Sequence, residues 1–507
     1  MSSFDLDHPL VEFISDSSRG VFTYRHSFEG IQIFGGIGGG KSSGPGKLFA
    51  HKFMQHGYGG LVLTAKEDEA SVWKEYAEMT GRSKDLIILE PNGKHTFNFL
   101  QYEAESGPDG MAPTENLVDL LKTVIKASEE KDTGSINDPF WEHSLNMLIF
   151  NIIDLCKLAY GRLSIQLMYD IAQTLPQKHE PVSEEGKQTA FEKAFRAAQR
   201  NVTAQMDAWI ASLSENKQRR FQEDGDLFEE ELVENLPDAR LLRFLDQFFM
   251  QSFRNLSDKT RSIIEFSFSN FLLRLLREPV YSLFCRYDCT FRPEDSLQGK
   301  IILLNLSVKR YQKVGRDCQI LFKYIWQRAM EKRDLRQNTR PVFLYADESQ
   351  NFIHELDALF QATARSSRVA TLYITQNLPN YYAAIGEKSE HRVKGFLGTM
   401  ACKIFTANAD NETNEYASKL IGDGYFIDQS RSVTLSQTIS QTQGQSLKLE
   451  RVVRPEQFQS LKTGGPKNNY RVEAYLHRQG DALFNGVNYL KTNFNQLYRP
   501  KENHVSL

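Results

Sequence analysis

In the first hundred residues, hydrophobic and polar positions show two periodicities in turn, the two-residue period of strands and the spacing of helices. Apolar and polar residues alternate through GVFTYRHSFEGIQIF, residues 20–34, which predicts a pair of strands. KLFAHKFMQH, from Lys47, has apolar residues at helical spacing, and a short buried strand over 61–64 follows it. A charged helix over 70–79 then precedes the strand LIIL, which begins at Leu86. This repeated strand–helix–strand order is typical of a parallel α/β sheet.

The pattern is mostly helical from about residue 105 to 295 and then returns to strands. DPFWEHSLNMLIFNIIDLCKLAY and TRSIIEFSFSNFLLRLLREP have the spacing of amphipathic or buried helices. Apolar, β-branched runs separated by helical stretches follow at 300–308, 340–349, 368–377 and 401–408. We therefore predict one α/β domain made of two sequence pieces, interrupted by a large all-α insertion domain. The predicted bounds are 1–105 and 296–482 for the two pieces, 106–295 for the insertion and 483–507 for a polar tail.

Two polar segments stand out from this organisation. Residues 180–235 include the basic run NKQRR and the acidic run EDGDLFEEELVEN. Such runs are expected to be solvated faces or a mobile segment, and docking of a partner is the alternative. The Ser/Gln-rich segment 434–446 is low in complexity and is predicted to be a loop.

Composition narrows the class of protein. A chain of 507 residues with 40% hydrophobic and 11% aromatic residues can form two or three domains and is not disordered. The net charge of −3 gives no general case for binding nucleic acid, although a local basic channel is compatible with it. The N-terminus has no signal-peptide pattern, and the most apolar run, from Leu145, is too short and polar to span a bilayer. Five cysteines without metal-ligand spacing suit reduced thiols, so we expect a soluble, cytoplasmic protein.

The glycine-rich stretch GGIGGGKS fits the phosphate-loop pattern G-x-x-x-x-G-K-[ST] between a predicted strand and a predicted helix. Its glycines let backbone N–H groups converge on phosphate oxygens, and the helix N-terminus adds its positive end. Lys41 is expected to contact the β- and γ-phosphates and the Ser42 hydroxyl to ligate Mg²⁺. A flexible linker is the alternative, but it would not require Lys-Ser in this register. The expected nucleotide-binding residues are Gly35, Gly36, Gly38, Gly39, Gly40, Lys41, Ser42 and Ser43.

The helix that follows the loop begins unusually. Gly44, Pro45 and Gly46 fall in its first turns. Proline is tolerated there, but each glycine weakens the turn by roughly 1 kcal/mol. We expect these glycines to allow close packing against a neighbouring segment.

A second acidic site is predicted at the end of the buried strand VFLYA, where Asp347 and Glu348 follow. Asp347 is expected to hold Mg²⁺ through its water shell, and Glu348 to polarise the attacking water. The alternative is an acidic pair that caps the next helix.

Polar residues around the next strand complete the candidate catalytic set. Gln376 ends that strand and is placed to sense the γ-phosphate. Arg365 and Arg368 precede the strand, and an arginine near a subunit boundary can reach a neighbouring subunit's nucleotide as a finger. For both arginines, a surface cation near a helix C-terminus is the alternative.

Seven segments between residues 30 and 425 occur in an order that resembles the soluble part of the type IV secretion coupling proteins. These TraD/TraG-like proteins are conjugative DNA-translocating ATPases of the FtsK/HerA branch of RecA-like motors. The segments are GGIGGGKS, LVLTAKEDE, LEPNGKHTFNFL, DPFWEHSLNMLIF, YADESQNF, ARSSRVATLYITQN and FTANADNETNEYASKLIG.

The resemblance implies a RecA-like P-loop motor domain that assembles into a homo-hexameric ring, with a helical insertion that handles substrate. ATP and Mg²⁺ are the implied cofactors. Lys41 and Ser42 would bind nucleotide and metal. Asp347 would hold the metal, Glu348 would polarise the attacking water, and Gln376 would sense the γ-phosphate. Arg365 would act in trans. DNA is the implied substrate, and secretion-channel, relaxase or adaptor proteins are the implied partners.

Two departures from the family pattern limit the resemblance. Thr64 stands where the family usually has an acidic residue, and the family's N-terminal membrane helices are missing from this sequence. We therefore expect a soluble variant, at most peripheral to the inner face of the membrane. It either docks on a secretion channel or no longer takes part in secretion. The expected function is a hexameric ATP-driven DNA translocase. The alternatives are an ATPase that recruits or translocates protein effectors and a nucleotide-gated ring with little turnover.

Overall fold

In the computed structural model the chain forms two compact units. The described residues are 4–14, 19–106, 113–129, 139–177, 188–354, 356–385, 390–435, 439–480, 484 and 486–500. Met1–Leu89 together with Pro293–Leu507 forms the sheet unit, and Glu90–Arg292 forms the helical unit. The first junction lies before residue 105 because α4 (Phe99–Glu105) packs on η5 (Ser282–Arg286) inside the helical unit.

The sheet unit contains a nine-stranded sheet in the order β13-β12-β9-β3-β8-β7-β4-β6-β5. Its strands are β3 (Ile31–Phe34), β4 (Gly59–Leu63), β5 (Leu86–Leu89), β6 (Ile301–Leu304), β7 (Val342–Ala346), β8 (Val369–Thr375), β9 (Cys402–Phe405), β12 (Arg471–Arg478) and β13 (Tyr489–Asn495). All neighbours from β9 to β5 are parallel, whereas β12 and β13 add an antiparallel edge. Strands from both sequence pieces alternate, since β3 lies between β8 and β9. The predicted α/β class, with a central mostly parallel sheet, is confirmed.

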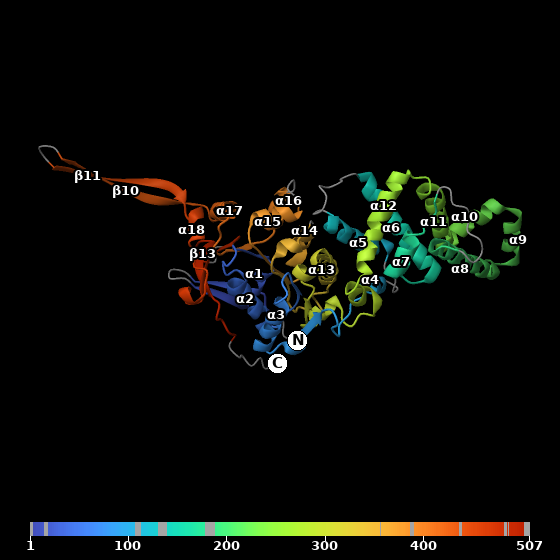
Figure 1. Cartoon of the computed structure of the whole chain (residues 1–507), viewed down its shortest axis with the longest axis horizontal. Coiled ribbons are helices and arrows are strands. Elements are labelled where there is room, and N and C mark those ends of the chain that lie inside the picture. Colours follow the sequence, from blue (N-terminus) through green and yellow to red (C-terminus); the bar gives the residue numbers. More distant parts are fainter. Residues whose placement is uncertain are drawn as a thin grey trace. The chain divides into compact units, whose positions relative to one another are not determined.

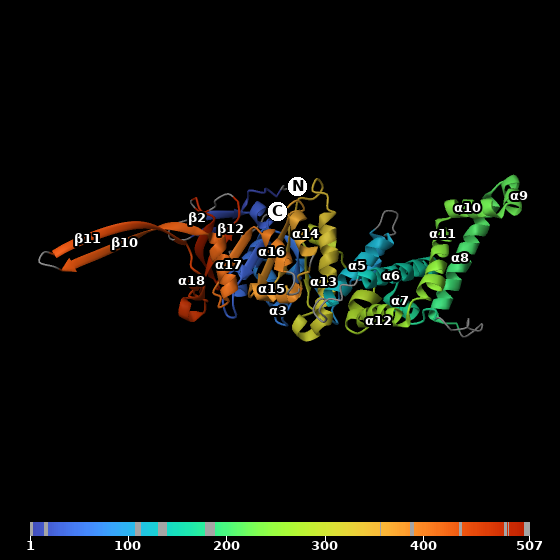
Figure 2. The same ribbon diagram turned by 90° about the horizontal axis from the view of Figure 1, so that it is seen from above.

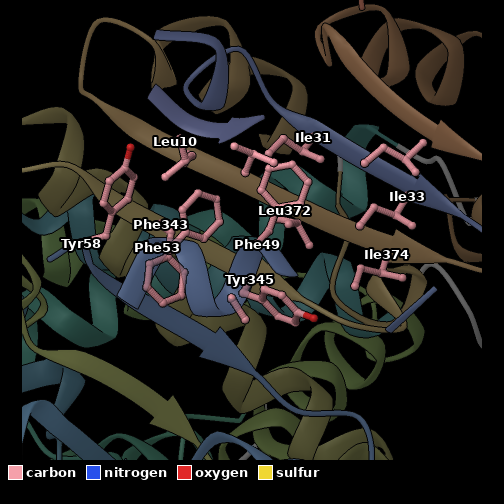
Figure 3. Packing of buried hydrophobic residues seen from close by; sticks show 14 of the residues in the cluster. Leu10, Ile31, Ile33, Phe49, Phe53, Tyr58, Phe343, Tyr345, Leu372 and Ile374 are labelled. Atoms are coloured by element: carbon pink, nitrogen blue, oxygen red, sulfur yellow. The ribbon is translucent and has the colours of Figure 1, made fainter. Parts of the chain in front are cut away.

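Alternating side chains of the strands pack against two different layers. On one face, Ile33 of β3 and Ile374 of β8 belong to the same core as Phe49 and Phe53 of α2 (Lys47–Gln55), as Figure 3 shows. On the other face, Phe34 contacts Tyr381 of α15 (Leu378–Ile385). Both faces of the parallel strands are therefore covered by helices, as a buried parallel sheet requires.

The remaining elements of the sheet unit surround these layers. They are β1 (Pro9–Ile14), β2 (Arg19–Thr23), α1 (Tyr24–Ser27), η1 (Ser42–Gly46), α3 (Glu69–Met79), α13 (Val308–Glu331), α14 (Leu356–Ala364), α16 (Glu390–Gly398), α17 (Asn411–Ile421) and α18 (Pro455–Gln459). β13 corrects the prediction of a polar tail after residue 482. Its alternate residues Leu490, Thr492 and Phe494 are buried, but three inward positions in a polar stretch are a weak signal of a strand.

Residues 434, 435 and 439–446 of the predicted Ser/Gln-rich loop belong instead to a long two-stranded ribbon (Figure 1), and residues 436–438 lie outside the described residues. β10 (Asp423–Leu435) pairs with β11 (Ile439–Arg451) antiparallel along its whole length. Tyr425 and Leu447, at its base, are 76% and 71% exposed. For the described residues the loop prediction is wrong, because the Thr, Val and Ile residues among the polar ones favour extended backbone.

The helical unit contains no strand among its described residues. Its helices are α4, α5 (Thr114–Glu129), α6 (Pro139–Tyr160), α7 (Ile165–Ala172), α8 (Ala190–Ser212), α9 (Glu215–Glu223), α10 (Gly225–Asn235), α11 (Pro237–Asp246) and α12 (Asp258–Leu275). α8 packs against α6 and α11, and its contact with α11 can be followed in Figure 2. Within the described part of the chain, no helix is both long and apolar enough to cross a membrane.

The polar zone 180–235 is helical wherever the structure describes it. Residues 188–235 include α8, α9 and α10, whose charged side chains are largely exposed, and residues 180–187 lie outside the described residues. The prediction of solvated faces is confirmed for this described part.

Candidate nucleotide-binding site

The glycine-rich loop connects β3 to η1 and α2, at the carboxyl edge of the parallel strands. Gly38 and Gly40 have φ angles of +72° and +80°, a left-handed region that favours glycine. A Cβ atom on Gly40 would come within 2.5 Å of Val472, and one on Gly39 within 2.6 Å of the carbonyl oxygen of Ala407. The backbone can therefore follow this path only with glycines. Within it the Gly36 N–H donates to the Ala407 carbonyl at 2.8 Å and the Gly39 N–H to the Gly36 carbonyl at 3.0 Å.

The glycines that follow the loop allow a close approach to the sheet. A Cβ on Gly46 would lie 2.8 Å from the Tyr345 hydroxyl oxygen and 2.9 Å from Ile374. A Cβ on Gly44 would lie 3.2 Å from the Cβ of Val472. The expected close packing is confirmed, and it holds the start of the helix directly against β7, β8 and β12.

Five of the predicted site residues lie together. Ser42 donates its hydroxyl to Asp347 Oδ2 at 2.7 Å. Lys41 Nζ lies 3.5 Å from Glu348 Oε1, and Gln376 Nε2 lies 3.4 Å from Glu348 Oε2. They meet because β3, β8 and β7 are parallel neighbours, so the residues that follow these strands gather at one edge of the sheet. Their roles in binding and catalysis stay predictions.

Glu348 has a strained backbone. Its φ and ψ angles are +49° and +47°, a conformation that costs a residue with a side chain on the order of 1–3 kcal/mol. The Glu348 N–H donates to Asp347 Oδ1 at 2.8 Å, and the Asn351 side chain donates to the Glu348 carbonyl at 2.9 Å. Local hydrogen bonds thus hold the strained turn that carries the acidic pair.

The surroundings of Glu348 favour its charged form. Burial works against ionisation, but the hydrogen bond from Gln350, at 2.8 Å, and the positive charges of Lys41 and Lys66 lower the pKa of Glu348 below its ordinary value. A carboxylate that stays ionised near neutral pH can accept a proton from water.

Two side chains of the site were missed by the sequence analysis. Lys66 Nζ lies 3.5 Å from Asp347 Oδ2 and 3.6 Å from Glu348 Oε1. Gln350 bridges Glu348 and the Thr375 hydroxyl, which donates to it at 2.9 Å. The signal for Lys66 was its position just after a strand, but only the pairing of β4 with β7 shows that this strand ends beside the acidic pair.

A buried ion pair supports the segment that follows Glu348. Lys323 of α13 is fully buried, and its Nζ donates to Asp357 Oδ2 at 2.6 Å and to the Phe352 carbonyl at 2.7 Å. Removing one partner of a buried pair typically costs about 3–5 kcal/mol, so this pair firmly ties the segment to α13.

Arg365 and Ser43 lie apart from the five converging residues. Arg365 follows α14 at the amino end of β8, is 61% exposed and pairs with Glu29 Oε1 at 3.7 Å. It is therefore at the opposite edge of the sheet from its own chain's glycine-rich loop. The Ser43 hydroxyl accepts a hydrogen bond from Gln496 at 2.7 Å, so its side chain faces the segment after β13.

The residues that converge fit a magnesium–nucleotide complex. The Ser42 hydroxyl and the Asp347 carboxylate are oxygen donors of the kind that Mg²⁺ prefers. The glycine-rich loop leads into a helix N-terminus, which together with the Lys41 ammonium suits a phosphate chain.

Comparison with known proteins identifies similar folds. Residues 341–463 match a protein family described as the TraM recognition site of TraD and TraG. The bacterial conjugative coupling protein TrwBdeltaN70, in an unbound form, has a TM-score of 0.60 at 13% identity over 95% of this chain and 88% of its own. The plasmid coupling protein TrwB in complex with ADP and Mg²⁺ has a TM-score of 0.57 at 12% identity, over 95% and 89%. No curated protein sequence matches at a significant level.

These similarities establish the fold of this chain as that of the conjugative coupling proteins. The predicted resemblance to type IV secretion coupling proteins is confirmed by the family match and by the shared fold. The predicted α/β fold, with a mostly parallel central sheet and a separate helical domain, is confirmed by the same comparison.

Proposed function

We propose that this chain is a Mg²⁺-dependent ATPase that works as a coupling motor and moves DNA. The observation that carries the proposal is the convergence of Lys41 and Ser42 with Asp347, Glu348 and Gln376 at one edge of the sheet. Solved structures of similar fold hold ADP with Mg²⁺, and others hold non-hydrolysable ATP and GTP analogues. Their ligands support a nucleoside triphosphate as the substrate.

In the proposed reaction, water attacks the γ-phosphorus of ATP, the bond from that phosphorus to the β–γ bridging oxygen breaks, and ADP and inorganic phosphate are released. The loop N–H groups and Lys41 would bind the phosphates, and Ser42 and Asp347 would hold Mg²⁺, which would supply positive charge to the phosphate oxygens. Glu348 orients the attacking water and accepts its proton, and Gln376 beside it senses the γ-phosphate. The lowered pKa of Glu348 keeps its carboxylate ionised, so it can accept a hydrogen bond from the attacking water.

Hydrolysis with and without DNA tests the substrate. We expect ATP hydrolysis by the purified protein to rise several-fold with either single-stranded or duplex DNA, and the form that stimulates more is the substrate. Lys41→Ala serves as the blank. Hydrolysis that is well above the blank but indifferent to DNA would contradict the translocase and favour an ATPase that recruits protein effectors. Slow hydrolysis near the blank would favour a nucleotide-gated ring.

A homo-hexameric ring with Arg365 acting in trans is also part of the proposal. The exposed position of Arg365, away from its own loop, suits a residue that reaches a neighbouring subunit. We expect Arg365→Ala to lower kcat by about 10³-fold or more, as for other arginine fingers, with nucleotide affinity of the protomer little changed. Turnover measured by phosphate release and binding measured with a fluorescent ADP analogue check this.

Mixing variants separates a trans role from a structural one. Arg365→Ala has an intact loop, and Lys41→Ala has an intact arginine, so mixed rings should regain a measurable fraction of activity. Arg336→Ala is the matched control, because Arg336 is also an exposed arginine near the amino ends of the strands. If mixing restores nothing although mixed rings form, Arg365 does not act across the interface.

The family match supports an adaptor-type protein partner as well. Its description names a TraM recognition site, and the matched residues 341–463 include the β10–β11 ribbon with its exposed apolar side chains. If the ribbon takes part, Leu447→Ser should weaken binding of a TraM-like adaptor in a direct titration, while ATP hydrolysis without the adaptor stays unchanged. Equal affinity for both proteins would exclude this part of the ribbon.

A further inference from the structure

Lys66 is a second lysine at the acidic pair, and the reaction proposed above does not use it. Its Nζ lies 3.5 Å from Asp347 and 3.6 Å from Glu348, so one ammonium faces both carboxylates. The Lys66 side chain is 33% exposed, whereas those of Asp347 and Glu348 are about one-tenth exposed. Solvent therefore screens this attraction only in part.

The turn that carries Lys66 is fixed on both sides. Gln319 of α13, which is fully buried, accepts from the Thr64 N–H at 2.7 Å and donates to the Thr64 carbonyl at 2.9 Å. The next N–H, that of Ala65, donates to Glu69 Oε2 at 2.8 Å. A backbone held so closely presents Lys66 at a defined place, unlike a lysine on a free surface loop.

The position of Lys66 conflicts with a metal ion on the same carboxylate. Ser42 and Asp347 are the proposed Mg²⁺ ligands, and Asp347 Oδ2 both accepts from Ser42 and faces Lys66. Two cations that share one carboxylate oxygen repel each other, and the repulsion is stronger here than in bulk water because the site is partly buried.

We propose that Lys66 is a positioning residue that holds Glu348 and competes with Mg²⁺ for Asp347. The ammonium keeps the metal affinity of the protein alone low. When nucleotide enters, its phosphates offer Lys66 another anionic partner, and Asp347 becomes available to the metal. This inference rests on the proposed nucleotide site, so its test must separate a wrong site from a wrong role for Lys66.

The test measures Mn²⁺ binding to the full-length protein without nucleotide, by electron paramagnetic resonance of the free ion. Lys66→Met removes the charge and keeps most of the side-chain length, and we expect it to bind Mn²⁺ about five- to tenfold more tightly. Lys66→Arg keeps the charge and should bind as the unmodified protein does. Lys74→Met, at an exposed lysine of α3, is the matched control and should change nothing.

The outcomes distinguish the two levels of the proposal. Unchanged or weaker Mn²⁺ binding by Lys66→Met, including no detectable binding by either protein, would overturn the role of Lys66. Lys66→Gln gives a second neutral variant in case the methionine variant does not fold. Asp347→Asn should abolish the gain when it is combined with Lys66→Met. If the gain survives, the metal binds elsewhere and the proposed site itself is wrong.

Discussion

Lys41→Ala is expected to lower kcat/KM for ATP by about 10²–10³-fold, the effect of removing one preorganised positive donor from a transition state. The reason is the position of the ammonium, which lies at the glycine-rich loop and 3.5 Å from Glu348. Since hydrogen bonds to charged groups contribute about 1.5–3 kcal/mol, affinity for ADP should also fall by roughly 10- to 100-fold. Phosphate-release kinetics and calorimetric titration with ADP measure the two effects.

A lysine just after the glycine-rich loop provides the control. Lys47 is in α2, and its Nζ donates to the Gln496 carbonyl at 3.0 Å, outside the converging residues. Lys47→Ala should therefore keep nearly full hydrolysis. Near-normal hydrolysis by Lys41→Ala would show that the glycine-rich loop does not bind the reacting phosphates.

Glu348→Gln is expected to separate binding from hydrolysis. The amide cannot accept a proton from water, and loss of a general base typically costs about 10²–10⁴-fold in kcat. The side chain keeps its size and can still accept from Gln350, so the strained turn and the affinity for ATP should be preserved. Single-turnover hydrolysis and equilibrium binding of a fluorescent ATP analogue, both at saturating Mg²⁺, measure this split.

An exposed carboxylate at the same edge of the sheet provides the control for Glu348→Gln. Glu67 follows Lys66 in the turn between β4 and α3, and Glu67→Gln removes one negative charge without touching the acidic pair. It should hydrolyse ATP normally. If Glu348→Gln also does, the base lies elsewhere, and the interpretation of Asp347 and Glu348 as a helix-capping pair gains support.

Local sequence patterns predicted most of the sheet unit and of the candidate site. Strand–helix alternation, the phosphate-loop spacing and the apolar strand ending in Asp347 and Glu348 are all readable from a few neighbouring residues, because each depends on short-range backbone geometry. The same locality explains two errors. The β10–β11 ribbon is rich in polar residues, and its extended backbone depends on pairing between its two strands. β13 alternates buried and exposed residues, but three inward positions are too few to stand out in a polar stretch.

The sequence did not predict which residues from different strands meet across the sheet. Lys66 and Gln350 enter the site because β4, β7 and β8 lie side by side, and nothing in the chain between residues 66 and 347 signals that contact. Arg365 shows the reverse case. Its short separation from Gln376 suggests proximity, but β8 runs between them and puts them at opposite edges of the sheet.

By itself, the sequence determined the α/β class, the glycine-rich loop and the acidic pair, since those depend on residue type and on spacing within single elements. Tertiary structure alone decided the strand order, the left-handed turn at Glu348 and the place of Lys66 between Asp347 and Glu348. The physical reason is that charges separated by hundreds of residues interact only when the sheet brings them within a few ångströms. Coulombic attraction depends on that distance and on burial, and the sequence specifies neither directly.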